Sequence, residues 1–314
     1  MCRKKDGEIP MKQENIKSCN VCPRNCKADR TENVGFCGVG DKAVISRVGL
    51  HLWEEPCISY GKGSGTIFFA GCNLGCVFCQ NHEISKTGKG VLVDTDTLCR
   101  EMLNLCDRGA VNINLVTPTH FSLQILRALE KVKHKLPVPV VYNCGGYESV
   151  ETLKELEGYI DIYLPDIKYY SHDFSEKYSR CPDYFEKAII ALEEMHRQSG
   201  YALFDEHGHM KSGVMVRHLV LPSLYKDSFK ILEELAKRFD VAKLPVSLMS
   251  QYFPTANCEK YPEINRRVTS LEYQKVVKYA KELGFVKGFV QDKASAKEEY
   301  VPSFDYGKNM EEIK

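Results

Sequence analysis

The sequence lacks an excess of charge of either sign. Its 314 residues include 43 Lys and Arg against 42 Asp and Glu, which gives a formal net charge of +1. Such a balance gives no reason to expect nucleic acid or an anionic membrane surface as a partner. Charge alone therefore leaves the substrate class open.

Long apolar runs are also missing. The longest, such as residues 66–70 and 214–221, fall far short of the roughly 18 to 20 residues that a membrane span needs. The opening segment, MCRKKDGEIP, has cationic residues with no apolar stretch after them, which argues against a secretory signal. The 43% hydrophobic content is nevertheless that of a folded globular chain. We therefore expect a cytoplasmic protein with no membrane partner.

Cysteine, in contrast, is abundant, with fourteen residues in the chain. Without a secretory signal, closely spaced thiols are more often metal ligands than parts of a disulfide framework. Two groups of cysteines are closely spaced, and the other seven lie singly. The first group reads Cys19-Asn-Val-Cys22-Pro-Arg-Asn-Cys26 with Cys37 further on, and the second reads Cys72-Asn-Leu-Gly-Cys76-Val-Phe-Cys79.

From Gly65 onward, short β-branched or aromatic runs alternate with longer amphipathic stretches. This alternation is typical of β/α units around a parallel sheet. Ser149 is placed to cap one helix, and Gly109 and Gly284 stand where a C-terminal glycine is expected. The expected strands are 66–71, 111–117, 138–144, 160–166, 214–221 and 246–252, and the expected helices are 95–108, 122–135, 149–157, 183–198, 227–239 and 270–284.

Six β/α units are fewer than the eight of a closed barrel. The sequence therefore predicts an α/β fold, an open partial (β/α)6 TIM-like barrel whose mouth lies at the C-terminal ends of the strands. Residues 1–62 do not fit the repeat and are expected to form a small Cys-rich metal-binding module before a barrel of residues 63–314. Residues 169–182 and 199–213 are expected to be loops near the mouth or its rim.

The second cysteine group follows directly after the first expected strand, at the edge where barrel-like folds carry their active sites. Thiolates at this spacing suit iron and sulfide. A four-iron cluster needs four ligands, whereas the loop offers three, Cys72, Cys76 and Cys79. One iron would therefore keep an open coordination site, at which it could chelate a small molecule and pass it an electron. The alternatives are a zinc site with a distant fourth ligand, or three core cysteines.

The segment GCNLGCVFCQN resembles the C-x3-C-x-aromatic-C loop of the radical S-adenosylmethionine (SAM) superfamily. Together with HLWEEPCISYGKGSGTIFFAG before it, it looks like the pyruvate formate-lyase activating enzyme-like branch, and the resemblance runs over most of the chain. The segments CNVCPRNC, GFCG, NINLVTPTH and MSQYFP add to it. The resemblance implies a [4Fe-4S] cluster on Cys72, Cys76 and Cys79 and SAM as cofactor, with Phe78 near the adenine and Asn81 following it.

Further SAM contacts are expected at the ends of later strands, where ligands meet such folds. Thr117 opens Thr-Pro-Thr-His at the place where similar activating enzymes carry Gly-Gly-Glu, and its hydroxyl or nearby carbonyls still offer acceptors to the SAM ammonium. Asn143 lies just before two glycines that permit close backbone approach to a ligand.

The fourth and fifth expected strands, 160–166 and 214–221, contribute charged candidates. Asp166 and Lys168 resemble the Asp-x-Lys of activating enzymes, in which the lysine meets the SAM carboxylate. Arg217 and His218 resemble a ribose and carboxylate contact, with a surface-paired arginine and a core histidine as the alternative.

The resemblance implies reductive cleavage of SAM to methionine and a 5'-deoxyadenosyl radical, followed by abstraction of a hydrogen atom from a substrate in the barrel mouth. The implied substrate is a glycine of a glycyl radical enzyme, which would be the partner of this activase, with a flavodoxin or ferredoxin as electron donor. Two alternatives stay open: a radical SAM enzyme acting on a small molecule or another peptide, and a non-catalytic metal-stabilised binding module. No catalytic acid, base or radical relay is assigned from the sequence.

The N-terminal cysteines have the spacing C-x2-C-x3-C, with a fourth cysteine after ten intervening residues. Four such thiolates would close a tetrahedral zinc site and stabilise a short module that lacks a large core. They would equally hold an auxiliary iron-sulfur cluster that relays electrons inward. Because spacing discriminates poorly between these metals, zinc, a second cluster and no metal all stay open for Cys19, Cys22, Cys26 and Cys37.

Overall fold

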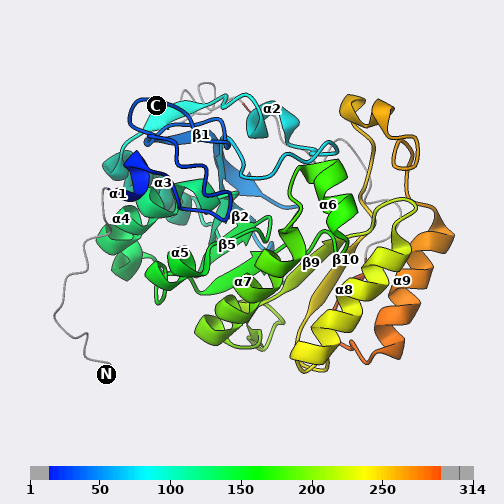
Figure 1. The fold of residues 1–314 in the computed structure, drawn as a ribbon. Helices are drawn as coiled ribbons and strands as arrows, with labels where there is room; N and C mark the ends of the chain where they lie inside the picture. The colour runs from blue at the N-terminus through cyan, green and yellow to red at the C-terminus, as the bar shows by residue number, and fades with distance from the viewer. Residues whose placement is uncertain (1–13, 291–303, 305–314) are drawn as a thin grey trace.

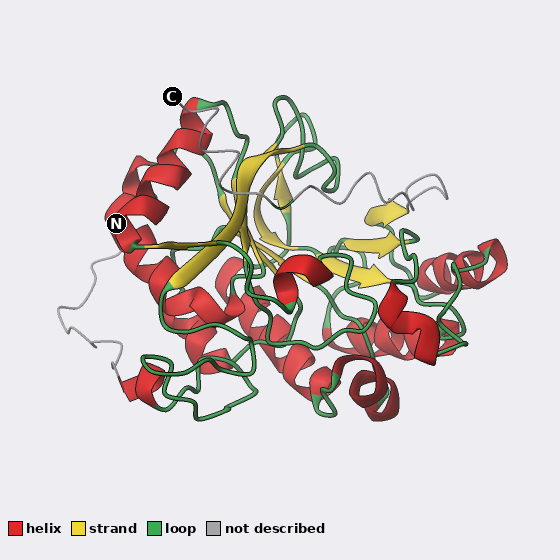
Figure 2. Cartoon of the chain, turned by 90° about the horizontal axis from the view of Figure 1, so that it is seen from above, coloured by secondary structure: helices red, strands yellow, loops and turns green. Residues whose placement is uncertain are grey.

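The computed structural model describes residues 14–290 and residue 304. They form a curved, mostly parallel sheet with helices along its convex side (Figures 1 and 2). The strands are β1 (Ala43–His51), β2 (Ser64–Phe69), β3 (Val91–Val93), β4 (Ile113–Val116), β5 (Val140–Cys144), β6 (Ile162–Pro165), β7 (Leu203–Phe204), β8 (Met210–Val214), β9 (Val216–Leu219), β10 (Val246–Met249) and β11 (Gly288–Val290). The helices are α1 (Glu14–Lys17), α2 (His82–Ser85), α3 (Thr95–Asp107), α4 (Ser122–Val132), α5 (Val150–Glu155), α6 (His172–Ser179), α7 (Tyr184–Ser199), α8 (Tyr225–Arg238) and α9 (Ser270–Glu282), with 3-10 turns η1 (Thr119–Phe121), η2 (Lys133–Lys135) and η3 (Ala256–Lys260).

The described strands form two hydrogen-bonded sheets, in the orders β3-β1-β2-β4-β5-β6-β8-β7 and β11-β10-β9. Strands β2, β4, β5 and β6 run parallel, as do β9, β10 and β11. The sheets join where β8 passes into β9. There the Met215 N–H donates to the Tyr163 carbonyl (3.0 Å) and the Ile167 N–H donates to the Arg217 carbonyl (2.8 Å). The six predicted strands are β2, β4, β5, β6, the continuous β8–β9 segment and β10, which confirms the partial barrel.

The predicted helices form because each places an apolar face on the sheet and has suitable ends. The Ser149 hydroxyl accepts a hydrogen bond from the Thr152 N–H and so caps α5. Gly109 and Gly284 follow α3 and α9 with φ values of 88° and 95°, a region that glycine enters without strain. No helix among the described residues is both long and apolar enough to cross a membrane.

Three segments differ from the sequence-based expectation. Residues 43–51 form β1, which pairs antiparallel with β2 and so extends the barrel sheet. Residues 169–182 contain helix α6 rather than a loop only, and residues 199–213 contain the hairpin of β7 and β8. Strand β1 escaped prediction because it precedes the β/α repeat, and Ser46, Arg47 and Gly49 interrupt its apolar run. Helix α6 has only eight residues, too few to show a helical period.

The chain before β1 contains one described regular element, the single-turn helix α1. Ile16, Cys19 and Val21 pack against Leu123 of α4, so this module lies beside α4 (Figure 1). The first 13 residues of the predicted module lie outside the described residues, as do residues 291–303 and 305–314 of the predicted barrel domain. The module thus has little apolar core of its own in its described part.

Candidate active site in the barrel mouth

A cavity of about 260 Å³ lies at the C-terminal ends of the parallel strands. Strands β2, β4, β5, β6, β9 and β10 each contribute residues at or just beyond their ends, as the barrel prediction required. The cavity brings together all three cysteines of the second group and seven of the eight predicted cofactor residues. These residues are Cys72, Cys76, Cys79, Phe78, Asn81, Thr117, Asn143, Asp166, Lys168 and Arg217.

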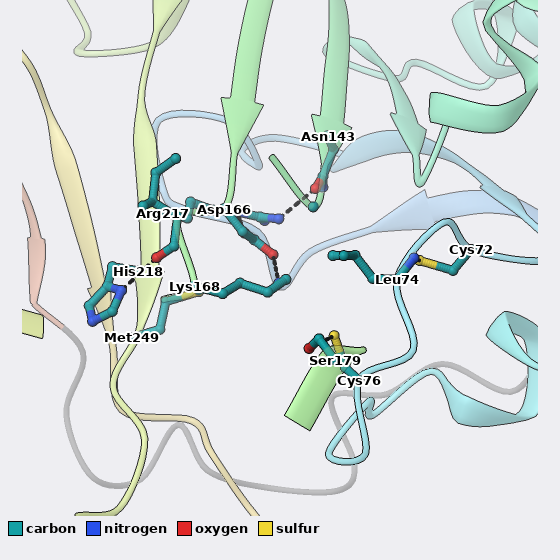
Figure 3. Close-up of polar contacts among 12 residues, drawn as sticks. Cys72, Leu74, Cys76, Asn143, Asp166, Lys168, Ser179, Arg217, His218 and Met249 are labelled. Carbon is teal, nitrogen blue, oxygen red and sulfur yellow. Dashed lines mark hydrogen bonds and ion pairs between the residues drawn. The ribbon is translucent and has the colours of Figure 1, made fainter. Parts of the chain in front are cut away.

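Each sulfur of the second cysteine group accepts a hydrogen bond from the protein. The Leu74 N–H donates to Cys72 Sγ (3.4 Å), the Ser179 hydroxyl to Cys76 Sγ (2.9 Å) and the Ser85 hydroxyl to Cys79 Sγ (3.3 Å). Figure 3 shows Ser179 beside Cys76 and the Leu74 nitrogen beside Cys72. These donors come from the loop itself and from helices α6 and α2, so three separate segments orient the three sulfurs.

These three thiols fit an iron-sulfur cluster. Burial raises the pKa of Cys72 and of Cys76, so both thiols hold their protons until a metal displaces them. No three His, Cys, Asp or Glu side chains in the described part of the chain are arranged to hold a metal ion. A four-iron cluster does not need that arrangement, because each cysteine binds a different iron and the sulfurs stand apart. Thiolate ligands and hydrogen bonds to sulfur are the features that such clusters use.

The opposite wall of the cavity carries an ion-paired network (Figure 3). Asp166 accepts from Lys168 Nζ (2.5 Å) through one carboxylate oxygen and from Arg217 Nε (3.0 Å) through the other. Burial alone would raise the pKa of Asp166, but the charges of Lys168 and Arg217 outweigh it and hold that pKa below its usual value. Burial alone would lower the pKa of Lys168, and Asp166 reverses that effect. Both partners therefore stay charged.

Glu54, which was not among the predicted site residues, completes this network. Its carboxylate accepts from Arg217 NH1 (3.2 Å) and from the amides of Asn114 (3.1 Å) and Asn143 (3.3 Å). Burial raises the pKa of Glu54, and Arg217 and Asn114 partly offset that effect. Glu54 follows β1 rather than a parallel strand, so no rule about strand ends pointed to it. Only the pairing of β1 with β2 brings it to the cavity.

Thr117 has a backbone conformation that is unusual for its residue type. Its φ is +58°, in the left-handed region that β-branched residues avoid and glycine favours. The turn after β4 thus has a glycine-like conformation at a residue that is not glycine. The strain lies at the cavity wall, where such outliers often accompany function.

His218 does not line the cavity, which contradicts its predicted role as a cofactor contact. Successive side chains of a strand point to opposite faces, so Arg217 enters the cavity and His218 points away (Figure 3). Its ring bonds the Ile167 carbonyl through Nδ1 (2.6 Å) and the Ser228 hydroxyl through Nε2 (2.8 Å). Burial lowers its pKa to about 4. His218 is a core histidine that anchors the segment leading to Lys168.

Phe78 and Asn81 both line the cavity. Phe78 is buried, and its ring packs edge-on against Tyr169 and Tyr252, with centroids 6.3 and 5.7 Å away. Asn81 precedes α2 at the cavity wall. The individual SAM contacts of Phe78, Asn81, Thr117, Asn143, Asp166, Lys168 and Arg217 stay predictions.

The N-terminal cysteines lie outside the cavity but directly behind the cysteine loop. Cys19, Cys22 and Cys37 are buried, and Cys26 is exposed. The Cys72 N–H donates to the Cys37 carbonyl (3.3 Å), so the two groups touch through their backbones.

Comparison with known proteins agrees with this site. The model of the Radical SAM superfamily matches residues 66–206. The chain is 32% identical over 284 residues to an uncharacterized protein of Methanocaldococcus jannaschii, covering 88% of this chain and 78% of that protein. It is 25% identical over 256 residues to the pyruvate formate-lyase-activating enzyme of Clostridium pasteurianum, covering 74% of this chain and 97% of that enzyme. Among solved structures, a spore photoproduct lyase variant has a similar fold, with a TM-score of 0.50 at 13% identity over 71% of this chain and 74% of the lyase.

The chain belongs to the radical SAM superfamily, in the branch that resembles pyruvate formate-lyase-activating enzyme. Its cofactors are therefore a [4Fe-4S] cluster and SAM. The residues present fit both groups, since the cavity has soft thiols on one wall and a lysine held by a carboxylate on the other.

Proposed function

We propose that this radical SAM enzyme is an activase that abstracts a hydrogen atom from a backbone glycine of a glycyl radical enzyme. The observation that carries the proposal is the similarity to pyruvate formate-lyase-activating enzyme, which spans 97% of that enzyme. The cysteine loop and the Asp166 and Lys168 pair, on which the predicted cofactor contacts rest, face each other across one cavity.

When both cofactors are bound, they supply a 5'-deoxyadenosyl radical by one-electron reductive cleavage of SAM. The protein's own contribution is to position the substrates of that chemistry. Lys168 offers an ammonium group to the SAM carboxylate, and Asp166 holds that ammonium in place before SAM arrives. Thr117 presents its hydroxyl and the backbone carbonyls of its turn toward the SAM ammonium.

The apolar part of the cavity limits the access of water. Leu74, Phe78, Leu219 and Met249 line it between the charged wall and the cysteines. With little water beside them, the charged groups of the opposite wall would interact more strongly with a charged cofactor than they would in water. These four side chains therefore contribute to positioning by excluding solvent.

The test is to reconstitute the cluster anaerobically and incubate the enzyme with SAM, a reductant and a glycyl radical enzyme encoded by the same genome. We expect a glycyl radical signal by electron paramagnetic resonance and formation of 5'-deoxyadenosine. The matched control replaces Cys72, Cys76 and Cys79 together by Ala and should give neither. Deoxyadenosine without a glycyl radical would refute the activase proposal but leave SAM cleavage intact.

A second candidate, a small polar substrate, is favoured by Glu54. A backbone glycine carries no charge, whereas Glu54, Arg217 and Asn143 present charged and amide groups to the same cavity. Under this candidate Glu54→Gln lowers hydrogen abstraction from the small molecule while uncoupled SAM cleavage continues. Under the activase proposal the variant keeps the yield of glycyl radical per deoxyadenosine.

A further inference from the structure

The four N-terminal cysteines converge although the module that holds them has almost no regular structure. A Cβ atom placed on Gly35 would lie 3.3 Å from Cys37 Sγ and 3.4 Å from Cys26 Sγ, so these two sulfurs face one point. Cys19 and Cys22 are held beside Cys26 by the backbone, because the Lys27 N–H donates to the Cys19 carbonyl and the Asn25 N–H donates to the Cys22 carbonyl, both at 3.0 Å. One set of turns therefore holds the four cysteines together.

The backbone around Cys26 is shaped to bring that cysteine back toward Cys19. Asn25 and Lys27, on its two sides, have φ values of 44° and 57°, which non-glycine residues seldom adopt. The Lys27 N–H donates to the Cys19 carbonyl, and the Cys19 N–H donates to the Ala28 carbonyl, both at 3.0 Å. Two strained residues and a tight loop thus serve the placement of a single thiol.

A buried arginine lies next to these thiols and has no carboxylate partner within the described chain. Arg30 is 2% exposed and donates to the carbonyls of Gly40 (3.0 Å) and His120 (2.7 Å). Its NH1 also lies 4.0 Å from Cys19 Sγ. A buried cation is costly unless an anion compensates it. Four thiolates around a metal centre carry a net negative charge, which would supply that anion.

The position of the thiols favours an iron-sulfur cluster over zinc. They lie between Cys26, which is exposed, and the loop that carries Cys72, Cys76 and Cys79, whose Cys72 N–H donates to the Cys37 carbonyl. A cluster at this position can transfer electrons, whereas zinc has no redox chemistry.

The N-terminal module also contacts the loop that carries Cys72, Cys76 and Cys79. In addition to the Cys37 carbonyl, which accepts from the Cys72 N–H, Arg24 donates to the carbonyls of Asn73 (2.8 Å) and Ser179 (3.1 Å). Cys26 is exposed at the protein surface. The module therefore spans the distance between solvent and the cysteine loop.

We propose that Cys19, Cys22, Cys26 and Cys37 hold a second iron-sulfur cluster that passes electrons to the cluster on Cys72, Cys76 and Cys79. A low-potential one-electron donor, such as a reduced flavodoxin or ferredoxin, gives one electron at the exposed Cys26 side and is itself oxidised by one electron. That electron then moves from the second cluster to the inner cluster, which is the one on Cys72, Cys76 and Cys79. The second cluster thereby returns to its oxidised state. The relay role rests on the SAM chemistry of the proposed function, whereas the existence of the second cluster does not.

The first experiment counts metals in two variants after anaerobic reconstitution with iron and sulfide. One variant replaces Cys72, Cys76 and Cys79 by Ala, and the other replaces the four N-terminal cysteines by Ser. We expect each variant to keep part of the iron, the sulfide and the visible absorption of the wild type. The amounts kept by the two variants should add up to the amount in the wild type. A variant with Cys99 and Cys106 replaced by Ala controls for the loss of cysteines as such and should keep all the iron. If the first variant binds zinc instead, or no metal, the proposal is overturned.

The second experiment tests the relay and guards against misfolding of the four-cysteine variant. Cys26→Ser changes only the exposed thiol, and the rate of inner-cluster reduction is followed by stopped-flow absorption. We expect slower reduction by flavodoxin and an unchanged final yield with the small reductant dithionite. Equal rates with flavodoxin for Cys26→Ser and wild type would overturn the relay. Failure of the activase proposal would leave all these results unchanged, because none of them depends on a glycyl radical.

Discussion

The two cysteine groups differ in what surrounds them, although they touch. The group on Cys72, Cys76 and Cys79 follows a fully buried strand, and the buried cations across its cavity are paired with Asp166 and Glu54. The N-terminal group lies before β1, in a stretch whose described residues contain no strand, beside Arg30, which has no carboxylate partner among the described residues. In the first region the protein alone balances the charges. In the second, the balance depends on what the thiols bind.

This contrast explains how each region is held in place. Strand β2 pairs with β1 and β4, so the cysteine loop begins from a fixed point before any cofactor binds. The N-terminal module relies on a few turn hydrogen bonds and a small apolar cluster. Small modules with little core are the ones that metals commonly stabilise.

The largest effect on SAM cleavage is expected when each of the two cysteine groups is removed in turn by mutation. Replacing Cys72, Cys76 and Cys79 by Ala should abolish SAM cleavage, because this removes the three cluster ligands of the cysteine loop. The four N-terminal Cys→Ser changes should keep deoxyadenosine formation with dithionite, measured by chromatography. If the first variant still cleaves SAM, the assignment of the cavity as the active site fails.

The charge contrast predicts a large loss of stability for Asp166→Asn. The change leaves Lys168 and Arg217 with one carboxylate fewer in a buried site, which costs about 3 to 5 kcal/mol of unfolding free energy. Urea denaturation measures it. Asp96→Asn is the matched control, since Asp96 pairs with Lys131 at the surface, where solvent screens the pair, and its loss should cost far less than the loss of Asp166. Equal effects of the two changes would contradict the charge assignment.

Acid should weaken the contact between the two regions. Burial lowers the pKa of His120 to about 3, below the value of about 6.5 in an unfolded chain. The folded state therefore binds fewer protons in this range, so the stability is complete above about pH 6.5 and falls as the pH drops toward 3, by about 1.4 kcal/mol per pH unit for this group. His120→Gln should reduce the slope of unfolding free energy against pH between 6 and 5 by that amount.

His120 is informative because it connects both regions. Its ring bonds the Ala70 carbonyl just before the cysteine loop, and its own carbonyl accepts from Arg30. Ser228→Ala, which removes a partner of the distant core residue His218, is the control and should leave the slope due to His120 in place. An unchanged slope in His120→Gln would show that His120 is not the group that titrates.

A smaller effect is expected on the reduction potential of the cluster. The Ser179 hydroxyl donates to Cys76 Sγ and is itself bonded to Tyr169. A hydrogen bond to sulfur stabilises the more negative, reduced state, so Ser179→Ala should lower the midpoint potential by about 40 mV, which corresponds to about 1 kcal/mol for one electron. Potentiometry followed by electron paramagnetic resonance measures it. Ser175→Ala, on the same helix but bonded to the His172 carbonyl, should leave the potential unchanged.

The smallest effect concerns the strained turn at Thr117. Thr117→Gly removes the cost of a left-handed β-branched residue and should stabilise the protein by about 1 kcal/mol, while SAM affinity falls if the hydroxyl accepts from the SAM ammonium. Thermal unfolding and equilibrium dialysis measure the two quantities. Thr119→Gly, two residues on, should instead destabilise the protein, because Thr119 donates to the buried Glu148. Destabilisation by Thr117→Gly would show that the turn is not strained.

Much of the fold follows from local patterns. The alternation of apolar runs and amphipathic stretches predicted six strands and six helices, because each β/α unit must bury one helix face on one strand. Strand β1 was missed because it precedes the β/α repeat and polar residues interrupt its apolar run, and helix α6 was missed because eight residues show no period. The start of the expected strand 214–221 was also more complex, because Met215 separates β8 from β9, which belong to two sheets.

The site was predictable to the extent that it follows strand ends. Thr117, Asn143 and Asp166 lie at or just after the C-terminal ends of parallel strands, and such ends meet at one edge of a barrel; Arg217, the second residue of β9, reaches the same edge by pairing with Asp166. Glu54 and Ser179 were missed because they reach the site from β1 and α6, which do not belong to the repeat. His218 was assigned to the wrong face, since a resemblance gives a position while the pleat of the strand decides its direction.

The sequence by itself indicated the chemistry of the three cysteines, because their spacing, their place after a strand and their resemblance to the radical SAM loop together point to a cluster at the mouth of a barrel. Only the tertiary structure decided how that cluster is surrounded. It joined Lys168 to Asp166, Arg217 to Glu54, and the N-terminal thiols to the back of the cysteine loop. These contacts link residues far apart in the chain, and no local pattern encodes them, because long-range partners are chosen by the packing of the whole barrel.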